Sequence, residues 1–165
     1  RHAAYRDLWW RLRPLAPAAR EQSLSLLRER LGGSAGARPW RLLGRRELVA
    51  DLVRHPLIDV GCHTVTHPQL SAQSDAEQIW QIGESRRQLE EVLGAPVRNF
   101  AYPYGEYSLD SPGFVRSLGL ASACTTEPGF VTSASDVFQL PRFGVESLPG
   151  EAFERQLEAW RRGSR

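Results

Sequence analysis

The sequence predicts one α/β domain in which strands and helices alternate as parallel βαβ units. Beyond the first 44 residues, short apolar runs alternate with longer segments of helical periodicity, which is the pattern that such units produce. The length of 165 residues suits a single domain that buries a core. A hydrophobic content of 41% with 24% charged residues excludes a disordered or collagen-like chain.

We interpret all 165 residues as a single domain with two parts. The first part, 1–44, is rich in Arg and Trp, is helical in pattern and is interrupted by prolines, so we expect a helical insertion or cover. Helical leucine spacing followed by Gly32 predicts a helix from about Pro17 to Leu31 within it. The second part, 45–165, carries the motifs that indicate function.

The second part contains one helix with clear signals at both ends. Ser74 followed by Glu77 forms a capping box, and Gly94 marks the end, which predicts a helix at 75–93. The remaining elements are expected, in order, as a helix at 44–55, a strand at 57–62, a strand at 97–102, a helix at 111–119, strands at 120–125 and 137–145, and a helix at 150–162.

Charge and residue usage narrow the classes of function. The net charge is +2, all 21 basic residues are arginine, and no basic stripe suggests a nucleic-acid partner. No segment approaches the roughly 20 apolar residues of a membrane helix. Because the sequence lacks methionine, we expect a fragment of a longer protein. Cys62 and Cys124 are expected to be separate buried thiols.

Two histidines follow the predicted strand at 57–62. His63 and His67 lie four positions apart, and neutral imidazole is a natural ligand for zinc or another divalent metal. The alternative is a pair of loop histidines bonded to the backbone. Because chemistry in α/β folds gathers at the carboxyl ends of strands, this loop is a candidate metal site.

A second motif follows the predicted strand at 97–102. Pro103 and Gly105 predict a tight turn with exposed backbone amides, which can bind an oxyanion, and the neighbouring tyrosines suit the face of a sugar. The alternative is a structural turn with aromatic packing. This turn is therefore a candidate for the catalytic and substrate-binding part of the site.

The stretches GCHTVTHPQL, FAYPYGEYS and LPRFGV, in this order, resemble the polysaccharide deacetylase family, also called the NodB homology domain or carbohydrate esterase family 4. The resemblance runs from about Arg45 to Leu157. It implies a deformed (β/α) barrel, incomplete at its N-terminus, and metal-dependent hydrolysis of N-acetyl groups on a sugar of a bacterial cell envelope or exopolysaccharide. The compartment, bacterial cytoplasm or cell envelope, is left open.

The resemblance also implies roles for individual residues. His63 and His67 are expected to bind the metal, usually zinc, and the Tyr104 backbone N–H is expected to stabilise the tetrahedral intermediate. Arg142 is the expected second catalytic group, because many family members carry an arginine where this sequence has Ala101. The neighbours of Tyr104 in the turn are expected to contact substrate; these are Tyr102, Pro103 and Gly105.

Two departures from the family pattern leave an alternative open. The aspartate pair of the family, which supplies a metal ligand and the general base, has no counterpart here, and no histidine follows His67. The alternative is an inactive domain that binds carbohydrate or positions a partner such as a glycosyltransferase. A third possibility keeps both histidines as structural residues without a metal.

Overall fold

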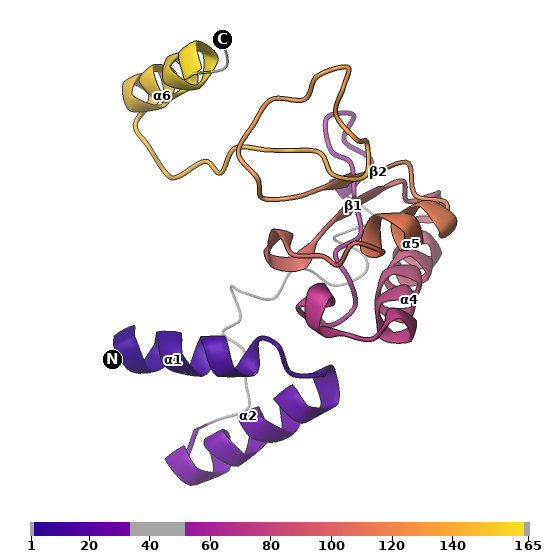
Figure 1. Cartoon of the computed structure of the whole chain (residues 1–165), viewed down its shortest axis with the longest axis vertical. Coiled ribbons are helices and arrows are strands. Elements are labelled where there is room, and N and C mark those ends of the chain that lie inside the picture. Colours follow the sequence, from indigo (N-terminus) through magenta and orange to yellow (C-terminus); the bar gives the residue numbers. More distant parts are fainter. Residues whose placement is uncertain (1, 34–51, 164–165) are drawn as a thin grey trace.

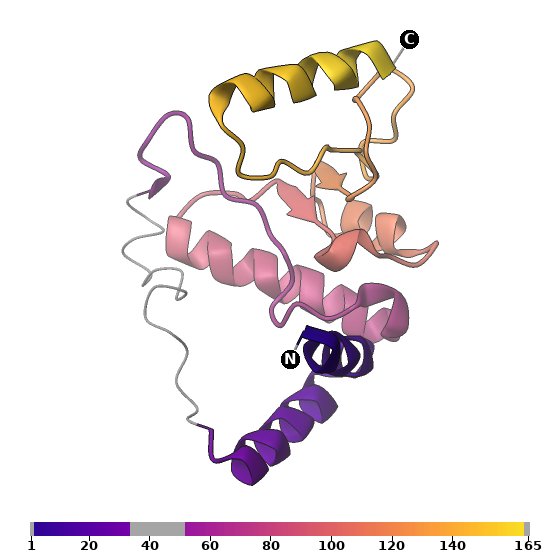
Figure 2. The same cartoon turned by 90° about the vertical axis from the view of Figure 1, so that its left-hand side faces the viewer.

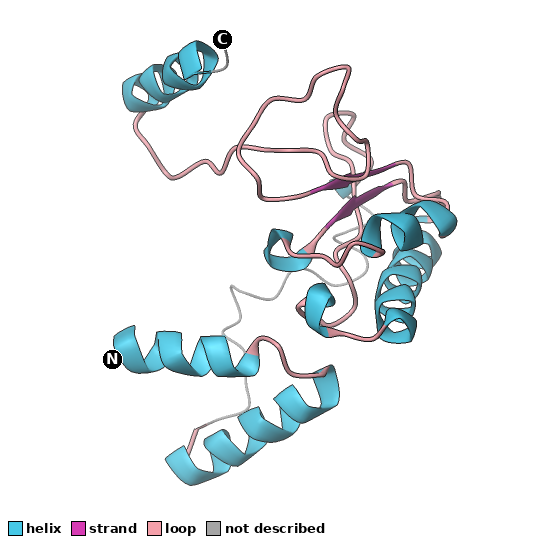
Figure 3. Ribbon diagram, in the orientation of Figure 1, coloured by secondary structure: helices cyan, strands magenta, loops and turns pink. Residues whose placement is uncertain are grey.

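The computed structural model describes residues 2–33 and 52–163, which form a mixed arrangement of helices and short parallel strands (Figures 1 and 3). The elements are, in order, α1 (His2–Leu12), α2 (Pro17–Leu31), η2 (Leu70–Ala72), α4 (Asp75–Leu93), β1 (Asn99–Ala101), η3 (Pro103–Gly105), α5 (Ser111–Ser117), β2 (Ser122–Cys124) and α6 (Gly150–Gly163). No helix in these two ranges is long and apolar enough to cross a membrane.

The sheet is parallel and centres on β1 and β2. Phe100 of β1 pairs with Ala123 of β2, and single-residue bridges from Cys62 to Phe100 and from Cys124 to Leu140 add one backbone segment on each side. The four segments therefore lie in the order Cys62, β1, β2, Leu140. Parallel neighbours of this kind confirm the predicted βαβ organisation.

All four predicted strands are shorter than the sequence suggests. The expected strands at 57–62 and 137–145 are each reduced to one bridging residue, Cys62 and Leu140. Leu57 is 88% exposed and Val137 is 50% exposed, so these apolar runs lack the burial that a full strand would give them. A strand forms only where a neighbour satisfies its backbone, which a local apolar pattern cannot guarantee.

The helices follow their local signals closely. The α4 helix begins after Ser74, whose hydroxyl accepts from the Glu77 N–H at 3.3 Å, and ends at Gly94 in the left-handed conformation. α2 ends at Gly32, also left-handed, as predicted. The helices expected at 111–119 and 150–162 are confirmed as α5 and α6, whereas most of the helix expected at 44–55 lies outside the described residues.

The core lies between the sheet and the two helices α4 and α5, with α5 packing against both α4 and β2. Its buried apolar side chains are Cys62, Leu70, Ile82, Val97, Phe100, Tyr102, Val115, Leu120, Ala123 and Phe138. Both cysteines are free thiols; Cys62 is fully buried and Cys124 half-buried, and burial raises the pKa of Cys62 to about 11. Two core residues, Cys62 and Leu70, flank the loop that carries the two histidines, so this loop is attached to the core at both ends.

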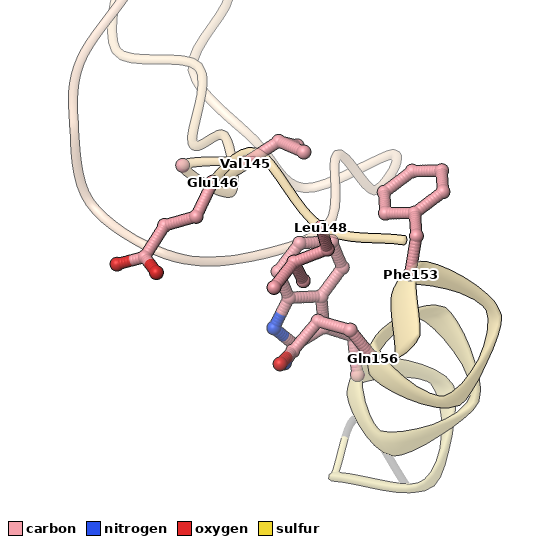
Figure 4. Close-up of a pocket in the computed structure, with 7 residues that line it drawn as sticks. Val145, Glu146, Leu148, Phe153 and Gln156 are labelled. Carbon is pink, nitrogen blue, oxygen red and sulfur yellow. The ribbon is translucent and has the colours of Figure 1, made fainter. Parts of the chain in front are cut away.

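The terminal helices lie at opposite ends of the molecule. α1 and α2 lie at one end, α6 lies at the other, and the sheet with α4 and α5 lies between them (Figures 1 and 2). Trp160 of α6 stacks on Phe143 with ring centroids 4.4 Å apart. A cavity of about 350 Å³ beside α6 is lined by Gly144, Val145, Glu146, Leu148, Phe153, Gln156 and Trp160 (Figure 4). Two of its lining residues, Gly144 and Val145, belong to the stretch LPRFGV.

Candidate active site

The two sequence motifs meet at the carboxyl ends of adjacent parallel segments. The Cys62 N–H donates to the Asn99 carbonyl at 2.8 Å, and the Ala101 N–H donates to the Cys62 carbonyl at 3.0 Å. This register places His63 beside the last residue of β1, where the η3 turn begins. Gly61 permits the approach, because a Cβ there would lie 2.9 Å from the Asn99 carbonyl oxygen.

Three rings gather at this edge. The centroids of His63 and His67 lie 4.7 Å apart with an interplanar angle of 75°. The Tyr104 ring lies edge-on to His67, with centroids 4.5 Å apart and an angle of 89°. The structure therefore brings together the histidine pair and the turn, as the sequence predicted.

The environment of His63 fixes which ring nitrogen is free. Its Nδ1 lies 2.6 Å from the Ala101 carbonyl oxygen, and a carbonyl can only accept, so Nδ1 carries the proton. The neutral ring then has its lone pair on Nε2, the nitrogen that faces away from this bond. A carbonyl that sets the tautomer in this way is typical of metal-binding histidines.

The loop that carries both histidines is backbone-strained. Thr64 has φ of 65° and His67 has φ of 53°, a region that non-glycine residues rarely adopt. The His67 N–H donates to Thr64 Oγ1 at 3.0 Å, and Arg20 of α2 donates to the His67 carbonyl at 3.0 Å and also to the Thr66 carbonyl. Partial burial, and then the neighbouring His63, lower the pKa of His67 and favour its neutral form.

Two backbone hydrogen bonds hold the η3 turn around Tyr104. The Gly105 N–H donates to the Tyr102 carbonyl at 2.9 Å and the Glu106 N–H donates to the Pro103 carbonyl at 3.1 Å. Tyr104 lies between these bonds, at φ 61° and ψ 1°, and its neighbours in the turn donate both of them. The role of the Tyr104 N–H as a donor to an oxyanion stays a prediction.

Tyr102 and Pro103 support the turn from below. Both side chains are fully buried, and the Tyr102 hydroxyl donates to the Phe138 carbonyl at 2.9 Å. Any contact that these two residues make with a substrate would therefore involve their backbone. The substrate-binding role of Tyr102, Pro103 and Gly105 stays a prediction. It would concern only the atoms of these residues at the surface of the turn.

We expect Tyr102→Phe to lower the free energy of unfolding by about 1 kcal/mol, because the buried Phe138 carbonyl loses its donor. The effect should depend on pH. Burial raises the pKa of Tyr102 above its ordinary value near 10, so the native state keeps a proton that the unfolded chain loses. The contribution of Tyr102 to the wild-type free energy of unfolding should therefore be fully present below pH 10 and be lost above it. The variant lacks this contribution, so its free energy of unfolding should fall less steeply. Urea unfolding at pH 8 and pH 11 measures this; parallel losses in both proteins would contradict it.

Arg142 lies on the β2 side of the turn. Its Nε donates to the Thr125 carbonyl at 2.7 Å, and the next residue, Thr126, donates from Oγ1 to the Tyr104 carbonyl at 3.3 Å. The Arg142 side chain is exposed and lines a shallow cavity of about 280 Å³ with Thr126, Phe143 and Gly144. The bond to Thr125 thus holds Arg142 next to Thr126, the residue that contacts Tyr104. The catalytic role of Arg142 stays a prediction.

The end of α1 forms a wall of the site that the sequence analysis did not assign. The Arg13 guanidinium lies 4.3 Å from the Tyr104 ring centroid and 4.8 Å from that of Trp9, and it also forms an ion pair with Glu106. Trp9 lies edge-on to Tyr104, with centroids 5.5 Å apart. In the sequence, the signal for this contact was the spacing of Trp9 and Arg13. They are four positions apart, so they share one face of a helix.

We expect Arg13→Met to lower the free energy of unfolding by about 2 kcal/mol. The side chain is only 5% exposed, so its loss leaves Glu106 without its partner and removes the cation–π contacts to the rings. Arg11→Met is the matched control, because Arg11 pairs with Asp7 where both side chains are mostly exposed. Thermal unfolding measures both variants; equal effects would show that Arg13 does not hold α1 on the turn.

An apolar cleft of about 300 Å³ lies between α1, α2 and the turn. It is lined by Tyr5, Leu8, Trp9, Leu12, Arg13, Arg20, Leu24, Leu27 and Tyr104. Tyr104 is thus shared between this cleft and the histidine pair. The cleft extends the candidate site toward the N-terminal helices.

The histidine pair fits two positions of a metal site. The rings are adjacent, and the tautomer of His63 leaves Nε2 available. Within residues 2–33 and 52–163, no third His, Cys, Asp or Glu joins them in a group that could hold a metal ion. The described residues therefore offer two candidate ligands.

The parallel sheet, with the histidine pair and the turn at its carboxyl edge, is part of a NodB-type fold. The chain belongs to the polysaccharide deacetylase family, whose sequence model matches residues 30–123. YxkH of Bacillus subtilis strain 168, named for the same family, is 23% identical over 114 residues, which cover 68% of this chain and 40% of that protein. The resemblance identified from the sequence is therefore confirmed.

Solved structures confirm the fold class. The Streptococcus pyogenes deacetylase PplD, solved in complex with acetate, gives a TM-score of 0.66 at 22% identity, covering 74% of this chain and 53% of that one. BC0361, a polysaccharide deacetylase from Bacillus cereus, gives 0.63 at 21% identity, covering 72% and 38%. The chain thus spans from about two-fifths to about half of the length of these relatives.

Proposed function

We propose that this chain takes part in the metal-dependent removal of N-acetyl groups from a carbohydrate. The observation that carries the proposal is the meeting of His63, His67 and Tyr104 at the edge of the sheet, with ring centroids 4.7 and 4.5 Å apart. Family membership supports the reaction class. The substrate that we propose is an N-acetylated sugar of a bacterial cell envelope or exopolysaccharide.

In this proposal His63 and His67 hold the metal through ring nitrogens. A zinc ion or another divalent metal, when bound there, supplies a Lewis acid for the acetyl carbonyl and activates water. Catalytic zinc usually has three protein ligands, so these histidines would be two of them. The Ala101 carbonyl, through its bond to Nδ1, would keep the His63 ring in the binding orientation.

The η3 turn would stabilise the charge that develops on the substrate. As water adds to the acetamide carbon, the carbonyl oxygen becomes negative, and the Tyr104 N–H would donate to it. Collapse then breaks the carbon–nitrogen bond and releases acetate and a free amine on the sugar. Arg142, held by the Thr125 carbonyl, would contribute positive charge on the same side.

The proposal is tested by acetate release from N-acetylglucosamine oligomers by the full-length protein. We expect release that stops when a chelator removes the metal and returns when zinc or cobalt is added. Binding of the oligomers without acetate release under any metal condition would overturn the deacetylase proposal. That result would favour a domain that binds carbohydrate or positions a partner, such as a glycosyltransferase.

A further inference from the structure

Gln81 is a fully buried polar side chain of α4 that faces the histidine loop. It is 0% exposed, although glutamine is usually found at the surface. Its position is one that α4 would ordinarily fill with an apolar side chain packed on the core. A buried carboxamide is tolerated only where its hydrogen bonds are made.

The carboxamide binds the backbone between the two histidines. Oε1 accepts from the Val65 N–H and from the Thr66 N–H, both at 3.0 Å. Nε2 donates to Thr66 Oγ1 at 2.8 Å and to a Glu77 carboxylate oxygen at 3.0 Å. The two acceptor sites and two donors of the amide are all used, and Glu77, as an acceptor, fixes which end is nitrogen.

The loop has a specific need for this support. Thr64 and His67 flank the two bonded amides, and both adopt positive φ, which persists only where the surroundings enforce it. The Thr64 hydroxyl supports the loop from within by accepting from the His67 N–H. From the core side, Gln81 holds the residues between His63 and His67 through the Val65 and Thr66 amides.

We propose that Gln81 is a positioning residue that sets the separation and orientation of His63 and His67 for metal binding. This inference rests on the proposed function and adds a residue that the sequence motifs do not contain. Gln81 touches neither ring. It acts through the Val65 and Thr66 amides, which lie between the two ligands in the chain.

With Glu77 in place, neither methionine nor glutamate can reproduce this arrangement. Methionine has similar length and shape, but it would leave the Val65 and Thr66 amides without their buried acceptor. Glutamate would place a second carboxylate beside that of Glu77, which now lies 3.0 Å from Gln81 Nε2. The glutamine amide alone offers an acceptor to the loop and a donor to Glu77 at the same time.

The same helix offers a matched control in Gln78. It is 1% exposed, lies one turn earlier on α4, and makes three hydrogen bonds where Gln81 makes four. Its amide donates to the Gln73 carbonyl and to Ser108 Oγ, and it accepts from Ser111 Oγ. Replacing it removes a buried glutamine from α4 without touching the histidine loop.

The first experiment compares Gln81→Met with Gln78→Met in the full-length protein. Zinc affinity is measured by competition with a chromophoric chelator, and amide hydrogen exchange is measured on the metal-free protein. We expect Gln81→Met to weaken zinc binding by about 10- to 100-fold, as for other outer-shell partners of metal ligands. The Val65 and Thr66 amides should exchange faster. Gln78→Met should change zinc affinity by less than about threefold even though it also lowers the thermal midpoint.

A second experiment tests rescue. Gln81→Glu alone should weaken zinc binding, because two carboxylates then meet in a partly buried site. Adding Glu77→Gln should restore affinity to within about threefold, since the exchanged pair again offers an acceptor to the loop, and the new amide at position 77 donates to the new carboxylate at position 81. A residue needed only to fill space would show no such recovery.

The outcomes separate this inference from the proposed function. Equal losses of zinc affinity in Gln81→Met and Gln78→Met, or no recovery in the double variant, would overturn the role of Gln81. Zinc binding that does not change on His63→Ala in the wild-type background would instead overturn the metal site itself. Loss of affinity only in the Gln81 variants, with recovery by exchange, supports the inference.

Discussion

Replacing His63 by alanine is expected to reduce zinc affinity by more than about 100-fold and acetate release to background. The loss of a direct ligand should exceed the 10- to 100-fold losses that outer-shell partners show. His63 also bonds to the Ala101 carbonyl at the end of β1, so its ring is held in place before a metal binds. Competition with a chromophoric chelator and an acetate assay measure the two effects.

His55→Ala is the matched control for this prediction. His55 is exposed, and its Nδ1 accepts from the Leu57 N–H at 3.3 Å within its own turn. We expect its removal to leave zinc affinity and acetate release unchanged. Zinc binding and catalysis that survive in His63→Ala would contradict the assignment of His63 as a ligand and would favour a structural histidine bonded to the backbone.

The second large effect is expected at Gly105. A Cβ there would overlap the Thr126 side chain and lie 2.7 Å from the Thr126 backbone nitrogen, and φ is +72°. Gly105→Ala must therefore move the turn away from β2, and we expect a loss of at least about 3 kcal/mol in the free energy of unfolding. Tyr104 would move with the turn, so acetate release should fall more than the fraction of folded protein does.

Gly94→Ala separates the steric effect from the backbone effect. Gly94 ends α4 at φ +64°, close to the value at Gly105, but nothing lies within 4 Å of an added Cβ. Its replacement should cost about 1–2 kcal/mol, the price of the left-handed conformation alone. Urea unfolding measures both variants. Equal losses at the two glycines would show that contact with Thr126 does not constrain the turn.

The helices could be predicted from the sequence because their signals are local. Ser74 and Gly94 bracket α4, and Gly32 ends α2, at positions that the sequence alone identifies. The short strands could not be predicted to the same accuracy. The apolar run at 57–62 looks like a strand, but only Cys62 in this run forms a β-bridge within the described residues. Pairing depends on distant parts of the chain, and a local pattern carries no information about them.

The candidate site was predictable only in part. The convergence of His63 and Tyr104 follows from the rule that loops meet at the carboxyl ends of parallel strands. The burial of Tyr102 was also encoded, because it lies two residues after Phe100 and shares its face of the strand. Gln81 was not identifiable, because a polar residue on a helix predicts an exposed face unless its tertiary partners are known. For Arg13 the sequence offered only its helical spacing from Trp9.

Residues of α1 and α2 contact the candidate site, so substitutions in these helices can alter its shape. The family match begins at residue 30, so α1 and nearly all of α2 lie outside it, yet Arg13 contacts Tyr104 and Arg20 contacts the His67 carbonyl. Substitutions at Tyr5, Leu8 or Leu24 would reshape the cleft beside Tyr104 and leave every matched motif intact. Two homologues whose matched motifs are identical can therefore differ in the shape of this cleft.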